Sequence, residues 1–234
     1  MTIREEFIAG KVFEIVQETN SLHIQVRASH PEDDVRVTLT GSSGNILHCY
    51  LLHLEMVIST LCQPNWWKNV CGKPEPDAND KNRMYNLDQI SKFLYFVHFY
   101  SQIEWNYRII LQAVKPATSK ITLLDNWKNI YSCLFKITSL EKYANLFDIA
   151  RLVRNAIHNN GYYLDQKQGD ISIEWAGHKY HFENGKQINF ATHENILLIC
   201  RELSKSMSAL IDSDEMKANP YIKNEFHLDN PHKD

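Results

Sequence analysis

The spacing of apolar residues along the chain predicts a mainly helical protein. From about Ile3 to Arg27 apolar residues recur at near-helical intervals with few breakers, which indicates a first helix. Pro31 and the Gly-Ser cluster that follows then break the periodicity, and the alternation of apolar residues from Val35 to Leu39 is typical of a loop or a short strand. We therefore expect the second helix to begin only at Asn45, which is a suitable N-cap.

Further helices follow along the chain. The most apolar segment, 87–114, is apolar on most of its circumference, so we expect it to be the central buried helix, ended by Pro116. Residues 63–86 before it form a Pro-rich polar connection. The other helices are predicted at 46–62, 123–137, 141–161 and about 192–211.

A small β insertion is predicted before the last helix, because the apolar period changes there to two residues. The segments 171–175, 179–183 and 186–190 alternate, and turns at Ala176–Gly177 and Asn184–Gly185 separate them. The fold class expected is therefore a mainly α helical bundle with a small antiparallel hairpin or meander. We expect one domain at 1–211, with the β insertion at 170–190, and a polar C-terminal tail at 212–234.

Composition restricts the class of protein and its location. The 234 residues are 44% hydrophobic, enough to build a core. The chain has no amino-terminal apolar signal segment and no apolar run as long as a membrane span, so we expect a cytoplasmic protein that does not enter a membrane. The five cysteines have no paired spacing, so we expect reduced thiols, and no sequence motif indicates a metal or another cofactor.

Charge is distributed unevenly, although the formal net charge is only −3. Residues 105–160 contain eight basic and three acidic residues, whereas residues 212–234 contain six acidic residues and three lysines. A site for a polyanion is therefore expected in the middle third of the chain.

One stripe of the helix predicted at 141–161 carries side chains suited to phosphodiester chemistry. At about 100° per residue, Arg151, Arg154 and His158 share a stripe roughly 60° wide with Phe147, and Asn155 lies beside it. Arginine binds phosphate through two parallel hydrogen bonds, histidine moves protons near neutral pH, and an asparagine amide can hold a phosphate oxygen or orient the imidazole. The residues expected on the core face, which is centred roughly 110° from this stripe, are Leu146, Ile149, Ala150, Val153 and Ile157.

The segment RLVRNAIHNNG at 151–161, followed by GYYLD and a hairpin, resembles the signature of the HEPN superfamily. In that signature an arginine, often followed by asparagine or another polar residue, precedes a histidine by four to six residues. HEPN domains are helical nucleotide-binding domains, and many are metal-independent endoribonucleases of toxin–antitoxin and phage-defence systems, acting as dimers with facing motifs. The resemblance implies an HEPN-like bundle over about residues 87–211, although only the motif itself is specific.

The resemblance makes Arg154, Asn155, His158 and Arg151 the candidate catalytic residues. Six residues separate Arg151 from His158, which fits the family spacing, whereas only three separate Arg154 from it. The following asparagine instead favours Arg154, and positions i and i+4 of a helix are neighbours, so we keep both arginines and prefer Arg154. The candidate substrate-binding residues are Asn159, Asn160 and Lys142.

The function expected is a metal-independent endoribonuclease that cleaves RNA by attack of the 2′-hydroxyl. His158 would act as general base or acid, and Arg154 with Arg151 would stabilise the charged phosphorane. One histidine supplies only one acid–base group, so a C2 homodimer with both motifs facing a shared cleft is expected. Partners expected besides RNA are a second copy and a cognate antitoxin or other partner protein. A non-catalytic dimeric module that binds nucleotide or protein, and a purely structural helical domain, are the alternatives.

Overall fold

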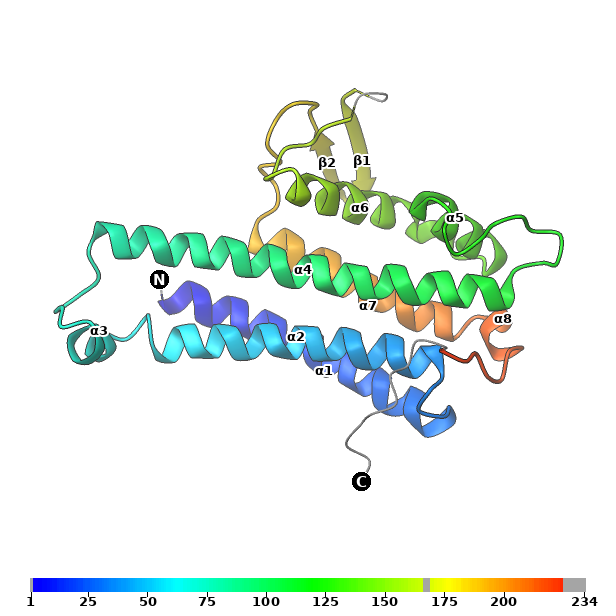
Figure 1. The fold of residues 1–234 in the computed structure, drawn as a ribbon, viewed down its shortest axis with the longest axis horizontal. Helices are drawn as coiled ribbons and strands as arrows, with labels where there is room; N and C mark the ends of the chain where they lie inside the picture. Colours follow the sequence, from blue (N-terminus) through cyan, green and yellow to red (C-terminus); the bar gives the residue numbers. More distant parts are fainter. Residues whose placement is uncertain (1, 166–168, 225–234) are drawn as a thin grey trace.

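The computed structural model describes residues 2–165 and 169–224. It consists mainly of packed helices, as the helical periodicity of the sequence predicts. The prediction of a mainly α fold with a small β insertion before the last long helix is confirmed. Figure 1 shows three layers of helices: α1 (Thr2–Ser29) with α2 (Val35–Ser59), then α4 (Ala78–Val114) with α7 (His193–Ile211), then α5 (Trp127–Ile137) with α6 (Ala144–His158).

The β insertion has two strands and not three. β1 (Ile171–Trp175) pairs antiparallel with β2 (His178–Phe182), and the pair packs on α6. The third strand predicted at 186–190 does not form, because this segment bonds instead to the chain that leaves α6: the Tyr163 amide donates to the Lys186 carbonyl and the Ile188 amide to the Gly161 carbonyl. The hairpin is thereby tied to the end of α6.

The loop or strand predicted around Val35 is wrong, because α2 begins there. Its N-cap is Asp34, whose side chain accepts a hydrogen bond from the Arg36 amide, and not Asn45. Residues 34–37 are all buried, so this first turn is covered on every side and its apolar residues have no helical period. Sequence periodicity cannot identify a helix that has no exposed face.

The Gly-Ser cluster that looked like a helix breaker is a close contact between helices. A Cβ atom on Gly41 would lie 2.9 Å from the His23 ring of α1, and one on Gly44 would lie 3.1 Å from the Asn20 side-chain oxygen. These residues lie in the middle of α2, where α1 packs against it. The glycines are therefore explained by helix packing and not by a turn.

The polar connection predicted at 63–86 is partly helical. It contains α3 (Pro64–Val70) and the first turns of α4, where Asp77 and Asp80 form a capping box. This end of α4 extends beyond the ends of α1 and α2 and is largely exposed, which explains its polar sequence (Figure 1). Taken alone, no described helix is long and apolar enough to cross a membrane; α2 and α3 pass that test only as a pair bent by 76°.

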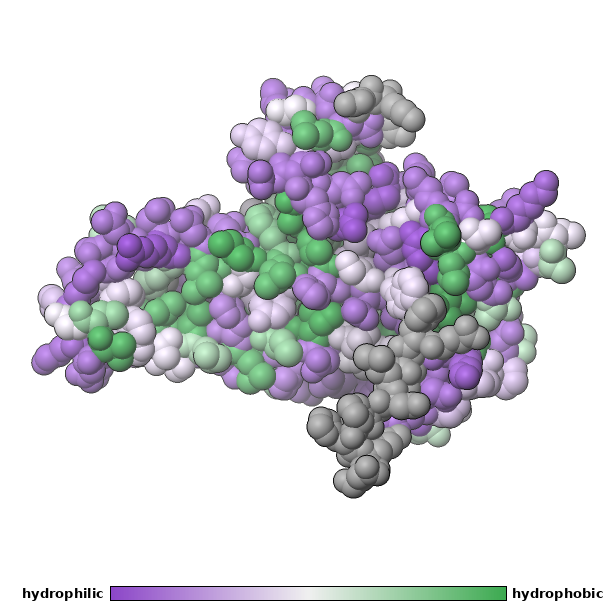
Figure 2. Space-filling model, viewed as in Figure 1, coloured by the Kyte–Doolittle hydropathy of each residue, from purple (hydrophilic) through white to green (hydrophobic). Residues whose placement is uncertain are grey.

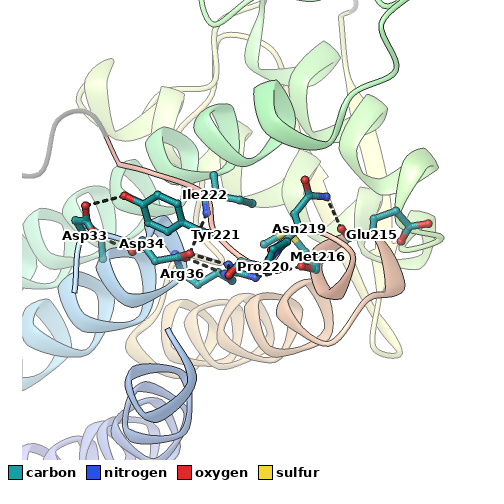
Figure 3. A network of polar contacts seen from close by, with 10 residues as sticks. Asp33, Asp34, Arg36, Glu215, Met216, Asn219, Pro220, Tyr221 and Ile222 are labelled. Carbon is teal, nitrogen blue, oxygen red and sulfur yellow. Dashed lines mark hydrogen bonds and ion pairs between the residues drawn. The ribbon is translucent and has the colours of Figure 1, made fainter. Parts of the chain in front are cut away.

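The polar tail predicted at 212–234 is docked on the fold as far as residue 224. It begins with the short helix α8 (Asp214–Lys217). The buried Arg36 guanidinium then donates to three backbone carbonyls within 216–220 at 3.0–3.1 Å, and the Ile222 amide donates to the Asp34 carboxylate at 3.0 Å (Figure 3). Residues after 224 in the predicted tail lie outside the described residues.

Candidate functional site

The core face predicted for α6 is confirmed. Leu146, Ile149, Ala150 and Val153 are fully buried, and Ile157 in the last turn is half-buried. This face holds α6 against α4 and α7. The rotation of α6, and so the direction of its other side chains, follows from that burial.

Phe147, which shares the stripe with the two arginines, anchors α6 further. It is fully buried, and its ring meets Phe135 of α5 edge-on and stacks on Tyr107 of α4, with centroids 4.8 and 5.4 Å away. The Tyr100 hydroxyl donates to the Phe147 carbonyl at 3.3 Å. Aromatic pairs of this kind contribute roughly 0.5–1.5 kcal/mol each beyond burial. The buried Phe147 ring therefore fixes the positions from which Arg151, Arg154 and His158, the other residues of the stripe, extend from α6.

The end of α6 is closed by the asparagines and glycine of the motif, as the sequence indicates. Asn159 is the C-cap, and Asn160 and Gly161 have φ values of 55° and 88°. The Gly161 amide donates to the Ala156 carbonyl at 2.8 Å, which satisfies one of the free carbonyls at the helix end. Contacts between residues 161–163 and 185–188 then fix this end against the hairpin segment.

Arg151 is engaged by neighbouring residues. Its guanidinium donates to the Asp148 carboxylate at 3.0 Å, and the Tyr131 hydroxyl donates to the same oxygen at 2.7 Å. Lys128 lies 3.6 Å from that oxygen as well. Burial and the bond to Asp148 together raise the pKa of Tyr131. Asp148 therefore offsets the charge of Arg151 and holds it to α5.

Arg154 is in a different electrostatic position, although it lies only one turn further along. Its guanidinium donates to the Asn155 side-chain oxygen at 3.3 Å, and its Nε, like that of Arg151, is buried without a hydrogen-bond partner. Among the described residues no carboxylate lies within 4.0 Å of it. Arg154 is thus the arginine of the motif whose charge is not paired, and it is half-buried.

His158 is exposed at the end of α6 and lines a groove of about 500 Å³ between α6 and α4. One wall consists of apolar α4 side chains, Phe93, Leu94 and Val97 among them, and the other includes His158 and Asn160. No other ionisable side chain lines this groove in the described part of the chain. The groove offers one proton-transfer group beside an apolar wall.

Of the three residues predicted to share one stripe of this helix, only His158 lines the groove. Arg154 and Arg151 precede it by one and two turns of α6 and do not line the groove. Asn155 is half-buried and accepts the bond from Arg154, so it positions that guanidinium. Arg154 and Asn155 are therefore in contact with each other one turn before His158, outside the groove, and Arg151 shares Asp148 with Tyr131 of α5.

The candidate substrate-binding residues separate into two groups. Asn159 and Asn160 are exposed beside His158, and Asn160 lines the groove. Lys142 precedes α6, over the ring of its neighbour Tyr143. At about 1.5 Å per helical residue it lies roughly 24 Å along the helix axis from His158. The structure does not bring Lys142 to the site.

The α4 wall of the groove is part of an exposed apolar face that sequence reasoning missed. The helix predicted to be buried around most of its circumference leaves Leu87, Ile90 and Leu94 exposed, at 38%, 64% and 51%, with half-buried Val97 beside them. These four residues form the open face of α4. Figure 2 shows hydrophobic residues gathered over the middle of this side of the molecule. Their spacing of three, four and three residues could have identified a second apolar stripe.

Some of the basic residues in the middle third of the chain hold the loop between α4 and α5 in place. Arg108 donates to Glu104 and to the carbonyls of Leu123 and Asp125. Lys115 bonds Gln112 and a carbonyl of the same loop. These cations fix the connection between α4 and α5. The described residues contain no cluster of three His, Cys, Asp or Glu side chains placed to hold a metal ion.

Comparison with known proteins finds no match to a family model, to a curated protein or to a solved structure. What the chain does must therefore be inferred from the chemistry of these residues.

Proposed function

We propose that this protein is a metal-independent endoribonuclease of HEPN type that cleaves RNA by attack of the 2′-hydroxyl. The observation that carries the proposal is the position of two residues one turn apart at the end of α6. Arg154 has no carboxylate partner among the described residues, and His158 is exposed. The resemblance of the motif to HEPN sequences supports the assignment to RNA and a role as a toxin or in phage defence.

The chemistry needs three roles, and the site residues can fill them. The 2′-oxygen of ribose attacks the neighbouring phosphorus, the bond to the 5′-oxygen breaks, and a cyclic phosphate and a free 5′-hydroxyl are left. His158 takes the proton from the 2′-hydroxyl or gives one to the departing oxygen. Arg154 stabilises the charge on the phosphoryl oxygens, and Asn155 holds its guanidinium in place.

A second copy of the chain would complete the site. The groove contains one ionisable side chain among the described residues, whereas the reaction uses both a base and an acid. The open face of α4 includes the apolar wall of this groove. Packing this face against its copy around a two-fold axis would bring two His158 side chains to one cleft. The proposed active form is therefore a C2 homodimer.

A non-catalytic module that binds nucleotide or protein is the second candidate function. The single ionisable group in the groove favours it, since an unassisted histidine is sufficient for binding but not for both proton transfers. In that case the pair Arg154 and His158 would hold a phosphate without cleaving it. A partner protein such as an antitoxin would be a further ligand of the same surface.

Exchanging the two arginines for lysine should separate their roles. Arg154→Lys is expected to lower RNA cleavage at least tenfold, because an ammonium cannot reproduce two parallel hydrogen bonds to phosphate. Arg151→Lys is expected to act mainly on stability, by roughly 1–2 kcal/mol, because it weakens a charged hydrogen bond to Asp148. Cleavage in EDTA and urea unfolding of both variants measure this. Severe loss of activity in Arg151→Lys with a silent Arg154→Lys would reverse the assignment.

Placing a charge on the open face of α4 should abolish the dimer. Leu94→Glu, at a side chain 51% exposed, is expected to give monomers with strongly reduced cleavage, because a carboxylate would have to be buried in the interface. Light scattering after gel filtration measures the mass. Leu124→Glu, at a loop residue 95% exposed outside this face, is the matched control and should leave both mass and activity unchanged. Full cleavage by a Leu94→Glu monomer would contradict the two-chain site.

A further inference from the structure

Lys128 lies beside the motif helix, although it is not part of the motif. It is the second residue of α5, and its side chain is 50% exposed. Its ammonium lies 3.6 Å from the Asp148 carboxylate of α6, which is too far for a hydrogen bond. Among the described residues its Nζ has no hydrogen-bond acceptor. The three N–H donors of this side chain are therefore open to a ligand that arrives from solvent.

The Asp148 carboxylate is already engaged by two other donors. Its Oδ1 atom accepts hydrogen bonds from Arg151 at 3.0 Å and from the Tyr131 hydroxyl at 2.7 Å. No second carboxylate lies within 4.0 Å of Lys128 or Arg151 in the part of the chain that the structure describes. One carboxylate thus faces two cations, and the cluster keeps an excess of one positive charge.

Arg154 continues this excess of positive charge towards the groove. It lies one turn after Arg151 on the same stripe of α6, and no described carboxylate lies within 4.0 Å of it. His158 follows one turn later and lines the groove. Cations that lack a full counterion therefore extend from the start of α5 along α6 to the groove. Such a row attracts a polyanion.

The length of this row corresponds to a few phosphates of one strand. Asp148, which Lys128 faces, precedes Arg154 by six residues of α6, roughly 9 Å along the helix axis. Phosphates follow one another at about 3.4 Å of axis in one strand of duplex DNA, and further apart in an extended strand. A strand with one phosphate at Arg154 would therefore present another to Lys128 within about three nucleotides.

We propose that Lys128 holds a phosphate of the RNA strand within about three nucleotides of the phosphate that is cleaved, so that the strand lies along α6 from the groove to α5. This proposal rests on the proposed function, since it takes Arg154 and His158 as the site of cleavage. A lysine binds phosphate as a point charge and reads no base, so the contact selects for the length of the strand and not for its sequence. The substrate is then an RNA of several nucleotides and not a dinucleotide.

The salt dependence of binding tests the contact without any need for cleavage. The probe is a 2′-O-methyl RNA octamer, which has no free 2′-hydroxyl. Lys128→Gln is expected to weaken binding at least threefold at low salt and to reduce the slope of log affinity against log salt by about 0.7, the value for one phosphate contact with a single strand. Lys128→Arg should keep the wild-type slope, because it keeps the charge. Fluorescence anisotropy measures both quantities.

Lys11→Gln is the matched control for this variant. Lys11 is 47% exposed and pairs with Glu14 at 3.1 Å, but it lies on α1, in another layer of helices, so its loss should leave binding of the octamer unchanged. An unchanged slope in Lys128→Gln would refute the contact, and so would a wild type that does not bind the octamer. Equally tight binding of polyglutamate of the same charge would indicate an acidic protein ligand and would overturn RNA as the ligand.

Cleavage kinetics separate this proposal from the ribonuclease assignment. In Lys128→Gln the KM for an RNA octamer is expected to rise at least threefold with kcat unchanged, whereas cleavage of the dinucleotide UpA should not change, because its one phosphate does not reach Lys128. Equal effects on the two substrates would contradict a distant contact. If the wild type binds the octamer with the expected slope but cleaves no RNA, the ribonuclease assignment fails and the phosphate contact stands. If the wild type cleaves RNA and Lys128→Gln equals it in both assays, the contact fails and the assignment stands.

Discussion

Replacing His158 by alanine is expected to lower RNA cleavage in EDTA by about 10²- to 10⁴-fold, the usual contribution of a general acid–base group. The side chain is exposed at the end of α6, so the free energy of unfolding should change by less than about 1 kcal/mol. Cleavage of an RNA panel, beside urea unfolding of the same preparation, measures both effects. The same panel made with 2′-deoxy substrate should stay intact, because the internal nucleophile is missing.

A histidine of similar exposure gives the control for this variant. His178 is exposed in β2, outside the groove, and His178→Ala should cleave as the wild type does. If His158→Ala cleaves normally, the ribonuclease proposal is wrong. If the wild type binds RNA without cleaving it and His158→Ala binds less, the binding module becomes the better description.

Arg36→Ala is expected to produce the largest loss of stability, about 3–5 kcal/mol, because it leaves a buried carboxylate without its partner. Arg36 is 2% exposed and Asp34 is fully buried, and the two are joined by hydrogen bonds of 2.6 and 2.8 Å. The guanidinium also holds the backbone of 216–220. Urea unfolding measures the loss, and trypsin should cut faster after the exposed Lys217 as this segment loosens.

The control for Arg36 is an arginine on the surface. Arg201 pairs with Glu18 while remaining 38% exposed, so Arg201→Ala should cost less than about 1 kcal/mol. Equal losses in the two variants would mean that the buried pair contributes no more than a surface pair does. That outcome would contradict the role of Arg36 in docking residues 216–224.

The buried pair of Arg36 and Asp34 also makes the stability of the protein depend on pH. Burial alone would raise the pKa of Asp34, but hydrogen bonds from Arg36 and the Ile222 amide outweigh burial and hold its pKa below the ordinary value of an aspartate. The folded state therefore binds this proton less tightly than the unfolded state does. The stabilisation is present above about pH 4 and is lost as the pH falls through the lower, folded pKa. In Asp34→Asn this part of the pH dependence should disappear.

The distribution of apolar residues was sufficient to identify most helices but not their limits. The amphipathic helices α5, α6 and α7 were predicted within a few residues, and Thr192 is the N-cap where the last helix was expected to begin. The start of α2 was missed because it is buried on all sides, and the start of α4 because it is exposed on most sides. Periodicity reports a boundary between core and solvent, and neither segment has one.

The sequence predicted only part of the candidate site, because only part of the site depends on the geometry of a single helix. Helix geometry alone placed Arg154 and His158 on one stripe, and the capping by Asn159, Asn160 and Gly161 followed from their conformational preferences. The sequence could not decide between the two arginines. The i,i+3 spacing of Asp148 and Arg151 was a signal for their ion pair, but the Tyr131 hydroxyl that shares this carboxylate comes from another helix.

By itself the sequence determined the properties that depend on neighbours along the chain: the mainly helical class, the hairpin turn before α7, the core face of α6 and the stripe on its flank. Only the tertiary structure decided the properties that depend on residues far apart in the chain. These are the pairing of Arg151 but not Arg154, the groove between α4 and the end of α6, and the docking of residues 216–224 on Arg36. The physical reason is that helix periodicity fixes directions within one element, whereas charge pairing and burial depend on which other elements pack against it.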